Sequence, residues 1–170
     1  MQLKTKWLLI LSILIFPTVV YLFFLQGEAN FDKPLDYIGP KSDSNYHSIP
    51  DFSFLNQFGD TISNDDYMGN VYVANFIFTT CPTICPVMTF HMTRIQQKFK
   101  NYPNFKLITH TINPEYDTPK VLLEYTKKMK IDSSLNNWNF VTGSTKDIYK
   151  MATSYFVNAT KDEKSPGGFL

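Results

Sequence analysis

The stretch Phe76-Ile77-Phe78-Thr79-Thr80-Cys81-Pro82-Thr83-Ile84-Cys85-Pro86 decides how this chain of 170 residues is interpreted. It contains the only two cysteines of the chain, and it joins an apolar predicted strand, residues 71–79, to a predicted helix. A helix N-terminus carries partial positive charge, which favours a thiolate over a thiol. Because a proline follows each cysteine at this junction, we interpret the two thiols as a reactive pair rather than as buried structural residues.

The composition limits what this pair can do. Two cysteines are too few for a disulfide scaffold or for a four-thiolate zinc site. They suit one dithiol/disulfide couple or one site for a soft metal ion. A formal net charge of +1 and the absence of a basic run argue against nucleic acid as a partner. The 15 Phe and 10 Tyr residues supply a large hydrophobic core.

The N-terminal region predicts a membrane anchor. Residues 7–25 contain no charged side chain, and their number is close to the roughly 20 residues that span a bilayer as a helix. A cleaved signal peptide is the alternative, but its apolar core is usually only about 7–15 residues long. Lysines at positions 4 and 6 predict that residues 1–6 stay in the cytoplasm. We therefore expect a single-pass protein of a bacterial-type plasma membrane.

The rest of the chain is predicted to lie on the periplasmic or extracytoplasmic side. Residues 26–50 show no sustained periodicity and contain Pro34, Pro40 and Pro50, so they are interpreted as a linker. Residues 51–170 form the predicted globular domain. Its cysteines would then lie in an oxidising compartment, where a free dithiol needs a reductant or a metal to persist.

Strand and helix signals alternate along this domain. The expected elements are a hairpin over 52–62 with its turn near Gly59, a strand over 71–78, a helix over about 86–102, a strand over 105–112, a helix capped by Thr118, a strand over 138–142, a helix capped by Ser144 and a short extended segment over 155–157. This alternation predicts a three-layer α/β domain with parallel strands.

Two runs resemble the Sco/SenC family, whose members have a thioredoxin fold and deliver copper to the copper-A site of cytochrome c oxidase. One is Phe78-Thr79-Thr80-Cys81-Pro82-Thr83-Ile84-Cys85-Pro86-Val87-Met88, and the other is Asp117-Thr118-Pro119-x-x-Leu122-x-x-Tyr125. The resemblance covers about residues 45–170. It implies a copper-binding chaperone whose partner is the copper-A subunit or another copper chaperone.

The resemblance also implies roles for particular residues. Cys81 and Cys85 would be the copper thiolates and also a reversible disulfide pair, and Asp117 would lie near the copper loop. Thiolates are soft ligands that suit Cu(I), with an imidazole as a natural third ligand. Cu(I) is therefore expected in preference to Cu(II) in this chain.

The family's third copper ligand is a histidine shortly after a Gly-rich loop. This sequence ends at Gly167-Gly168-Phe169-Leu170, so that histidine is expected just after Leu170, together with the last strands and helix of the fold. Neither remaining candidate replaces it. His91 is rotated about 240° from Cys85 on the predicted helix, and His110 shares a strand face with Ile108 and Ile112, which predicts a hydrogen-bonded core histidine.

Two other functions remain open at this stage. The same pair could serve a thiol-disulfide oxidoreductase of the thioredoxin type, in which Cys81 and Cys85 are catalytic and act on a partner's cysteines. The chain could also be a non-functional fragment that keeps the motif without the complete fold. A metallochaperone requires no enzymatic activity, whereas the oxidoreductase does.

Overall fold

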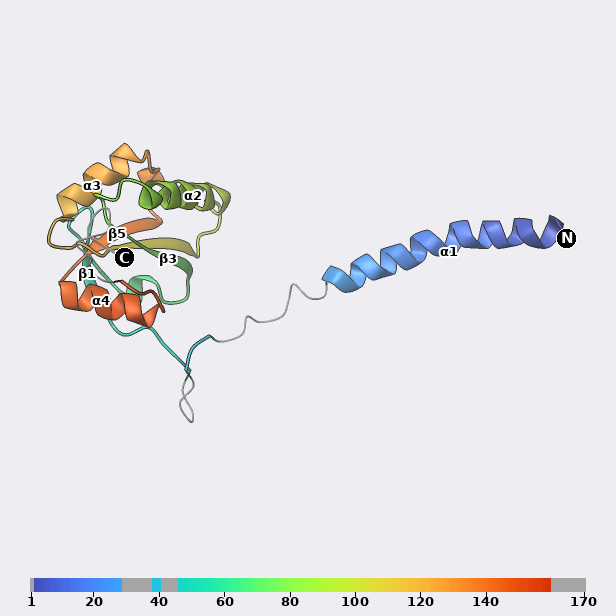
Figure 1. Ribbon diagram of the computed structural model, residues 1–170, viewed down its shortest axis with the longest axis horizontal. Coiled ribbons are helices and arrows are strands. Elements are labelled where there is room, and N and C mark those ends of the chain that lie inside the picture. The colour runs from blue at the N-terminus through green and yellow to red at the C-terminus, as the bar shows by residue number, and fades with distance from the viewer. Residues whose placement is uncertain (1, 29–37, 41–45, 160–170) are drawn as a thin grey trace. The chain divides into compact units, whose positions relative to one another are not determined.

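The computed structural model of the chain describes residues 2–28, 38–40 and 46–159 (Figure 1). The chain divides into two compact units, Met1–His47 and Ser48–Leu170. The second unit contains both cysteines and every strand among the described residues.

The first unit contains the helix α1 (Gln2–Glu28), with Pro17 inside it. This helix includes the predicted anchor, residues 7–25. Its described apolar side chains are largely exposed, among them Phe16 at 72% and Phe23 at 74%. Over the part of the chain that the structure describes, we find no helix that is both long enough and apolar enough to cross a membrane.

A five-stranded sheet forms the centre of the second unit, in the order β2-β1-β5-β4-β3. Its strands are β1 (Ser53–Asn56), β2 (Thr61–Ser63), β3 (Val71–Ile77), β4 (Phe105–Thr111) and β5 (Trp138–Thr142). β3, β4 and β5 are parallel, as expected, whereas β1 is antiparallel to β2 and to β5. The predicted hairpin therefore joins the same sheet and makes it mixed.

Three helices cover the two faces of this sheet. They are α2 (Ile84–Lys98), α3 (Pro119–Lys128) and α4 (Thr145–Ser154). Figure 1 shows α2 and α3 on one face and α4 on the other, which confirms the three-layer α/β arrangement. Short 3-10 helices, η1 (Asn64–Asp66) and η2 (Ser133–Leu135), complete the described elements.

Each face of the sheet has its own hydrophobic core. The core under α2 and α3 includes Leu107, Phe140 and both cysteines, and the core under α4 includes Ile108, Val141 and Ile148. Because side chains alternate across a strand, neighbouring residues such as Leu107 and Ile108 supply opposite cores. The thiol pair thus belongs to the α2/α3 side.

The predicted helix starts are confirmed by their caps. The Thr118 hydroxyl accepts a hydrogen bond from the Val121 N–H at 3.5 Å, and the Ser144 hydroxyl accepts one from the Asp147 N–H at 3.1 Å. These bonds satisfy N–H groups that a helix leaves unpaired in its first turn. They fix where α3 and α4 begin.

Two local predictions are wrong. The segment 155–157 is not extended: α4 ends in a turn, with Phe156 in the left-handed region at φ 59°. The second concerns β3, whose nearly continuous apolar run predicts a strand covered on both faces. Most of its residues are only partly buried, and Val71 is 71% exposed. The reason is that β3 pairs with β4 alone among the described strands.

Candidate metal and redox site

The two cysteines lie where β3 passes into α2. Cys81 is in the turn that follows the strand, and its N–H donates to the Phe78 carbonyl at 3.1 Å. Cys85 lies inside the first turn of α2, because the helix begins at Ile84, two residues before the predicted start. Both thiols are free and buried, at 6% and 3% exposure. The sequence prediction of a thiol pair at a strand-to-helix junction is confirmed.

The surroundings of the two thiols differ. The Cys85 N–H donates to the Cys81 Sγ at 3.4 Å. Burial alone would raise the pKa of the Cys81 thiol, but hydrogen bonds from the N–H groups of Cys85, Thr83 and Ile84 outweigh burial, so this pKa lies below its ordinary value. Burial, together with the neighbouring Cys81 and Asp117, raises the pKa of Cys85 to about 12. Cys81 therefore becomes a thiolate first, while Cys85 keeps its proton.

Asp117 holds the strand end that leads into the cysteine turn. Its carboxylate is fully buried and accepts hydrogen bonds from the Thr79 N–H at 3.1 Å, from the Thr79 hydroxyl and from the Thr111 hydroxyl. Thr79 follows β3, Thr111 ends β4, and Asp117 precedes α3. One carboxylate thus connects three segments at the carboxyl ends of the parallel strands, two residues before Cys81.

A polar pair in the core next to Cys85 was not anticipated from the sequence. The hydroxyls of Thr89 and Tyr125 lie 2.9 Å apart, and Thr89 is fully buried one turn after Cys85 on α2. Burial raises the pKa of Tyr125, as do the nearby Cys85, Cys81 and Asp117 groups. Position 89 is one helical turn from position 85, so the sequence could have placed Thr89 on the buried side beside Cys85, but not its contact with Tyr125.

The histidines do not complete a metal site in the described structure. His91 is exposed on α2. His110 is fully buried, and neither ring nitrogen has a hydrogen-bond partner. Its ring contacts those of Phe52, Phe54, Phe76 and Tyr155. The prediction that His110 is hydrogen-bonded is therefore wrong. The surrounding aromatic rings come from residues 52–54, from β3 and from the residue that follows α4.

No group of three or more His, Cys, Asp or Glu side chains within the described ranges is arranged to hold a metal ion. The position expected for the third ligand follows Leu170 and, like residues 167–170, lies outside the described residues. The local donor set is therefore the two thiols. Two sulfur donors in a buried setting fit a soft ion such as Cu(I) far better than a hard ion such as Mg²⁺.

The fold and the thiol pair together define a class: a mixed α/β, thioredoxin-like protein with two cysteines at a strand-to-helix junction. Residues 40–169 match the family model described as SCO1/SenC. The chain is 40% identical over 141 residues to the SCO1 protein homolog of Bacillus subtilis, covering 81% of this chain and 67% of that protein. The chain belongs to the SCO1/SenC family.

Solved structures agree with this assignment. A SCO1/SenC family lipoprotein from Bacillus anthracis superposes with a TM-score of 0.65 at 33% identity, over 72% of each chain. BsSco, described as a member of the Sco family of cytochrome c oxidase assembly proteins with a disulfide switch, gives 0.58 at 38% identity, over 68% of this chain and 67% of that one. Copper-bound ScoI from Arabidopsis thaliana gives 0.60 at 27% identity, over 72% and 75%. Copper binding and oxidase assembly are thus recorded for members of this family.

Proposed function

We propose that this chain is a copper chaperone that binds Cu(I) through Cys81 and Cys85 and delivers it to the copper-A site of cytochrome c oxidase. The observation that carries the proposal is the pair of free, buried thiols at the start of α2, one of them with a lowered pKa. Metal binding requires thiolates and releases their protons. Cys81 supplies the first thiolate, and the bound cation then favours loss of the proton from Cys85.

The small ligand set supports transfer of copper rather than its permanent storage. Two sulfur ligands leave coordination positions of Cu(I) open to a donor from a partner protein. An acceptor site can therefore bind the ion before the chaperone's thiolates release it. Asp117 would act as a positioning residue, because it fixes the strand end before Cys81 without contacting the ion.

Metal analysis of the full chain tests this proposal. The chain is reduced without oxygen in neutral detergent, loaded with Cu(I) under a competing chelator and desalted. We expect about one Cu(I) per chain, and loss of binding in Cys81→Ser and in Cys85→Ser. Met92→Leu is the matched control, because it removes another buried sulfur of α2 and should leave loading intact. Copper retained by both serine variants would contradict the proposal.

A second function, thiol-disulfide exchange, is favoured by the unequal thiols. The Cys81 thiolate would attack a partner's disulfide, form a mixed disulfide and displace one partner thiolate. Cys85 would then lose its proton, attack the Cys81 sulfur and displace the second partner thiolate. The partner gains two electrons, and the chain ends as a Cys81–Cys85 disulfide. A mixed disulfide trapped by Cys85→Ser, in a chain that loads no copper, would favour this function.

We also propose that residues 7–25 anchor the protein in the membrane, with residues 1–6 in the cytoplasm and the thiol domain outside. The support is the charge-free sequence, the exposed apolar side chains of α1 and the description of the Bacillus anthracis relative as a lipoprotein. Carbonate extraction of membranes tests attachment. Protease added to intact spheroplasts should remove the domain if it lies outside.

A further inference from the structure

The exposed side of α2 carries apolar side chains in its first turns and basic side chains in its last turns. At about 100° per residue, six side chains of this helix fall within one sector about 120° wide, roughly opposite Cys85 and Met92. They are Ile84, Val87, Phe90, His91, Arg94 and Lys98. We call this set the α2 stripe. All six are exposed, which confirms that the stripe faces away from the core.

The first half of the stripe is apolar. Ile84, Val87 and Phe90 are 63%, 51% and 57% exposed. They occupy the first two turns of the helix, and Ile84 directly precedes Cys85 in the chain. A partner that approaches the thiols along the N-terminal turn of α2 would contact these side chains. Neighbouring exposed apolar side chains of this kind are typical of an interaction surface.

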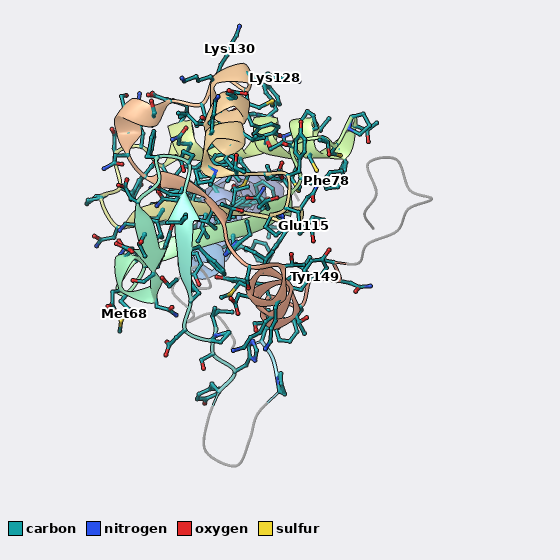
Figure 2. The ribbon with its side chains drawn as sticks, turned by 90° about the vertical axis from the view of Figure 1, so that its left-hand side faces the viewer. Met68, Phe78, Glu115, Lys128, Lys130 and Tyr149 are labelled. Carbon is teal, nitrogen blue, oxygen red and sulfur yellow. The ribbon has the colours of Figure 1, made fainter. Side chains whose placement is uncertain are left out.

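The second half of the stripe is basic. His91, Arg94 and Lys98 line a shallow groove of about 440 Å³ together with Ile95. The sequence of α2 contains no Asp or Glu that would offset the charges of Arg94 and Lys98. The neighbouring helix α3 ends in Lys127 and Lys128 on the same side of the sheet. Figure 2 shows Lys128 and Lys130 pointing outward at that end.

We propose that the α2 stripe is the docking surface for the protein that exchanges copper with the thiol pair, and that this partner presents an apolar patch bordered by acidic side chains. The inference rests on the proposed function. The apolar half, which begins at Ile84 next to Cys85 in the chain, supplies the apolar contact with the partner, and the basic half attracts and orients the acidic border. Charges at the rim of an interface mainly accelerate association and fix the orientation of the partner.

A protein fits this pattern better than an anionic membrane does. A helix that lies on a membrane carries its apolar side chains along its whole length, with basic side chains on either flank. On α2 the two kinds are separated along the axis: apolar residues occupy the N-terminal turns and basic residues the C-terminal turns. A helix that lies on a membrane would need apolar side chains in its C-terminal turns as well, where α2 instead carries Arg94 and Lys98.

The test measures association of the full, reduced, metal-free chain in neutral detergent with the soluble apo copper-A domain of the oxidase. Two variants probe the stripe, Arg94→Glu/Lys98→Glu and Phe90→Ser. The matched control is Lys146→Glu/Lys150→Glu, which makes the same change of charge on α4, across the sheet. We expect binding to weaken about tenfold in each stripe variant and to lose its salt dependence in the charge variant. The control should stay within about twofold of the parent.

The outcomes separate this inference from the proposed function. Cu(I) loading of every variant is measured alongside, and should match that of the parent, because no stripe residue is a proposed ligand. A parent chain that binds no Cu(I) would refute the proposed function. The binding data would still show whether the α2 stripe is the docking surface. Equal weakening by the α4 control, no weakening by either stripe variant, or no binding by the parent would overturn the inference. So would stripe variants that lose binding only to vesicles of phosphatidylglycerol and phosphatidylcholine.

Discussion

Replacing His110 with phenylalanine should stabilise the domain and reduce its sensitivity to acid. His110 stacks on Phe76, with ring centroids 4.8 Å apart and an angle of 17° between the rings, and it has no hydrogen-bond partner on either nitrogen. A neutral imidazole carries one donor and one acceptor. Leaving such groups buried and unpaired costs about 1–3 kcal/mol. A phenyl ring keeps the stacking and removes that cost, so we expect a gain of about 1–2 kcal/mol in the free energy of unfolding at pH 7.

The pH dependence gives a sharper test. Burial lowers the pKa of His110 to about 3, whereas a histidine in an unfolded chain titrates near 6.5. The unfolded state therefore binds a proton that the folded state excludes, and stability falls as the pH drops from about 6.5 towards 3. Between pH 7 and pH 5 this loss is about 2 kcal/mol. His110→Phe should be free of it, so its advantage over the parent should grow by that amount.

Urea unfolding at pH 7 and pH 5 measures both effects. Trp138 is buried, and its indole N–H donates to the hydroxyl of Thr109, next to His110. Its fluorescence reports on unfolding of the domain when Trp7, the other tryptophan, is replaced by phenylalanine in every protein compared. His91→Phe is the control, because His91 is exposed and its replacement should change stability little. A His110→Phe variant that is less stable than the parent, or that keeps the same difference between pH 7 and pH 5, would refute the reasoning.

Three further predictions concern the turn at the thiols and the packing of β1. Iodoacetamide should alkylate Cys81 faster than Cys85 at pH 8, because the pKa of Cys81 is lowered and that of Cys85 is raised. Mass spectrometry of the two single-cysteine variants measures both rates, and the reverse order would contradict the assigned roles. Asp117→Asn should destabilise the domain by about 1–3 kcal/mol, since a neutral amide accepts fewer of the three hydrogen bonds that Asp117 accepts. An unchanged urea midpoint would show that these three hydrogen bonds contribute little to stability. Gly143→Ala should cost about 1–3 kcal/mol, because the added Cβ would lie 2.5 Å from the Phe54 ring; an unaltered melting temperature would mean that this ring moves aside freely.

Much of the fold could be predicted because its signals are local. The cap of α3 joins positions 118 and 121, and that of α4 joins positions 144 and 147. The apolar strand before Cys81 and the period of Met88, Met92 and Ile95 likewise depend on neighbours within a few residues. These patterns were sufficient to order the strands and helices and to place the thiol pair at the junction between β3 and α2.

The errors arose where distant segments meet. The sequence could not show that β3 lies at an edge of the sheet among the described strands, because strand order depends on pairing across the chain. It could not show that His110 lacks partners, because the rings around that histidine come from residues 52–54, from β3 and from the end of α4. Residues 155–157 turn instead of extending because α4 continues to Ser154.

The sequence by itself determined that this chain has two cysteines, that they lie at a strand-to-helix junction and that the domain alternates strands with helices. Those properties follow from residue identity and short-range periodicity. Only the tertiary structure decided that the thiols are unequal and buried. It also decided that Asp117 accepts a hydrogen bond from Thr79, 38 residues away in the sequence, and that the α2 stripe faces outward. Burial and charge at the site depend on which distant side chains fill the space around each sulfur, and that choice is made when the layers pack.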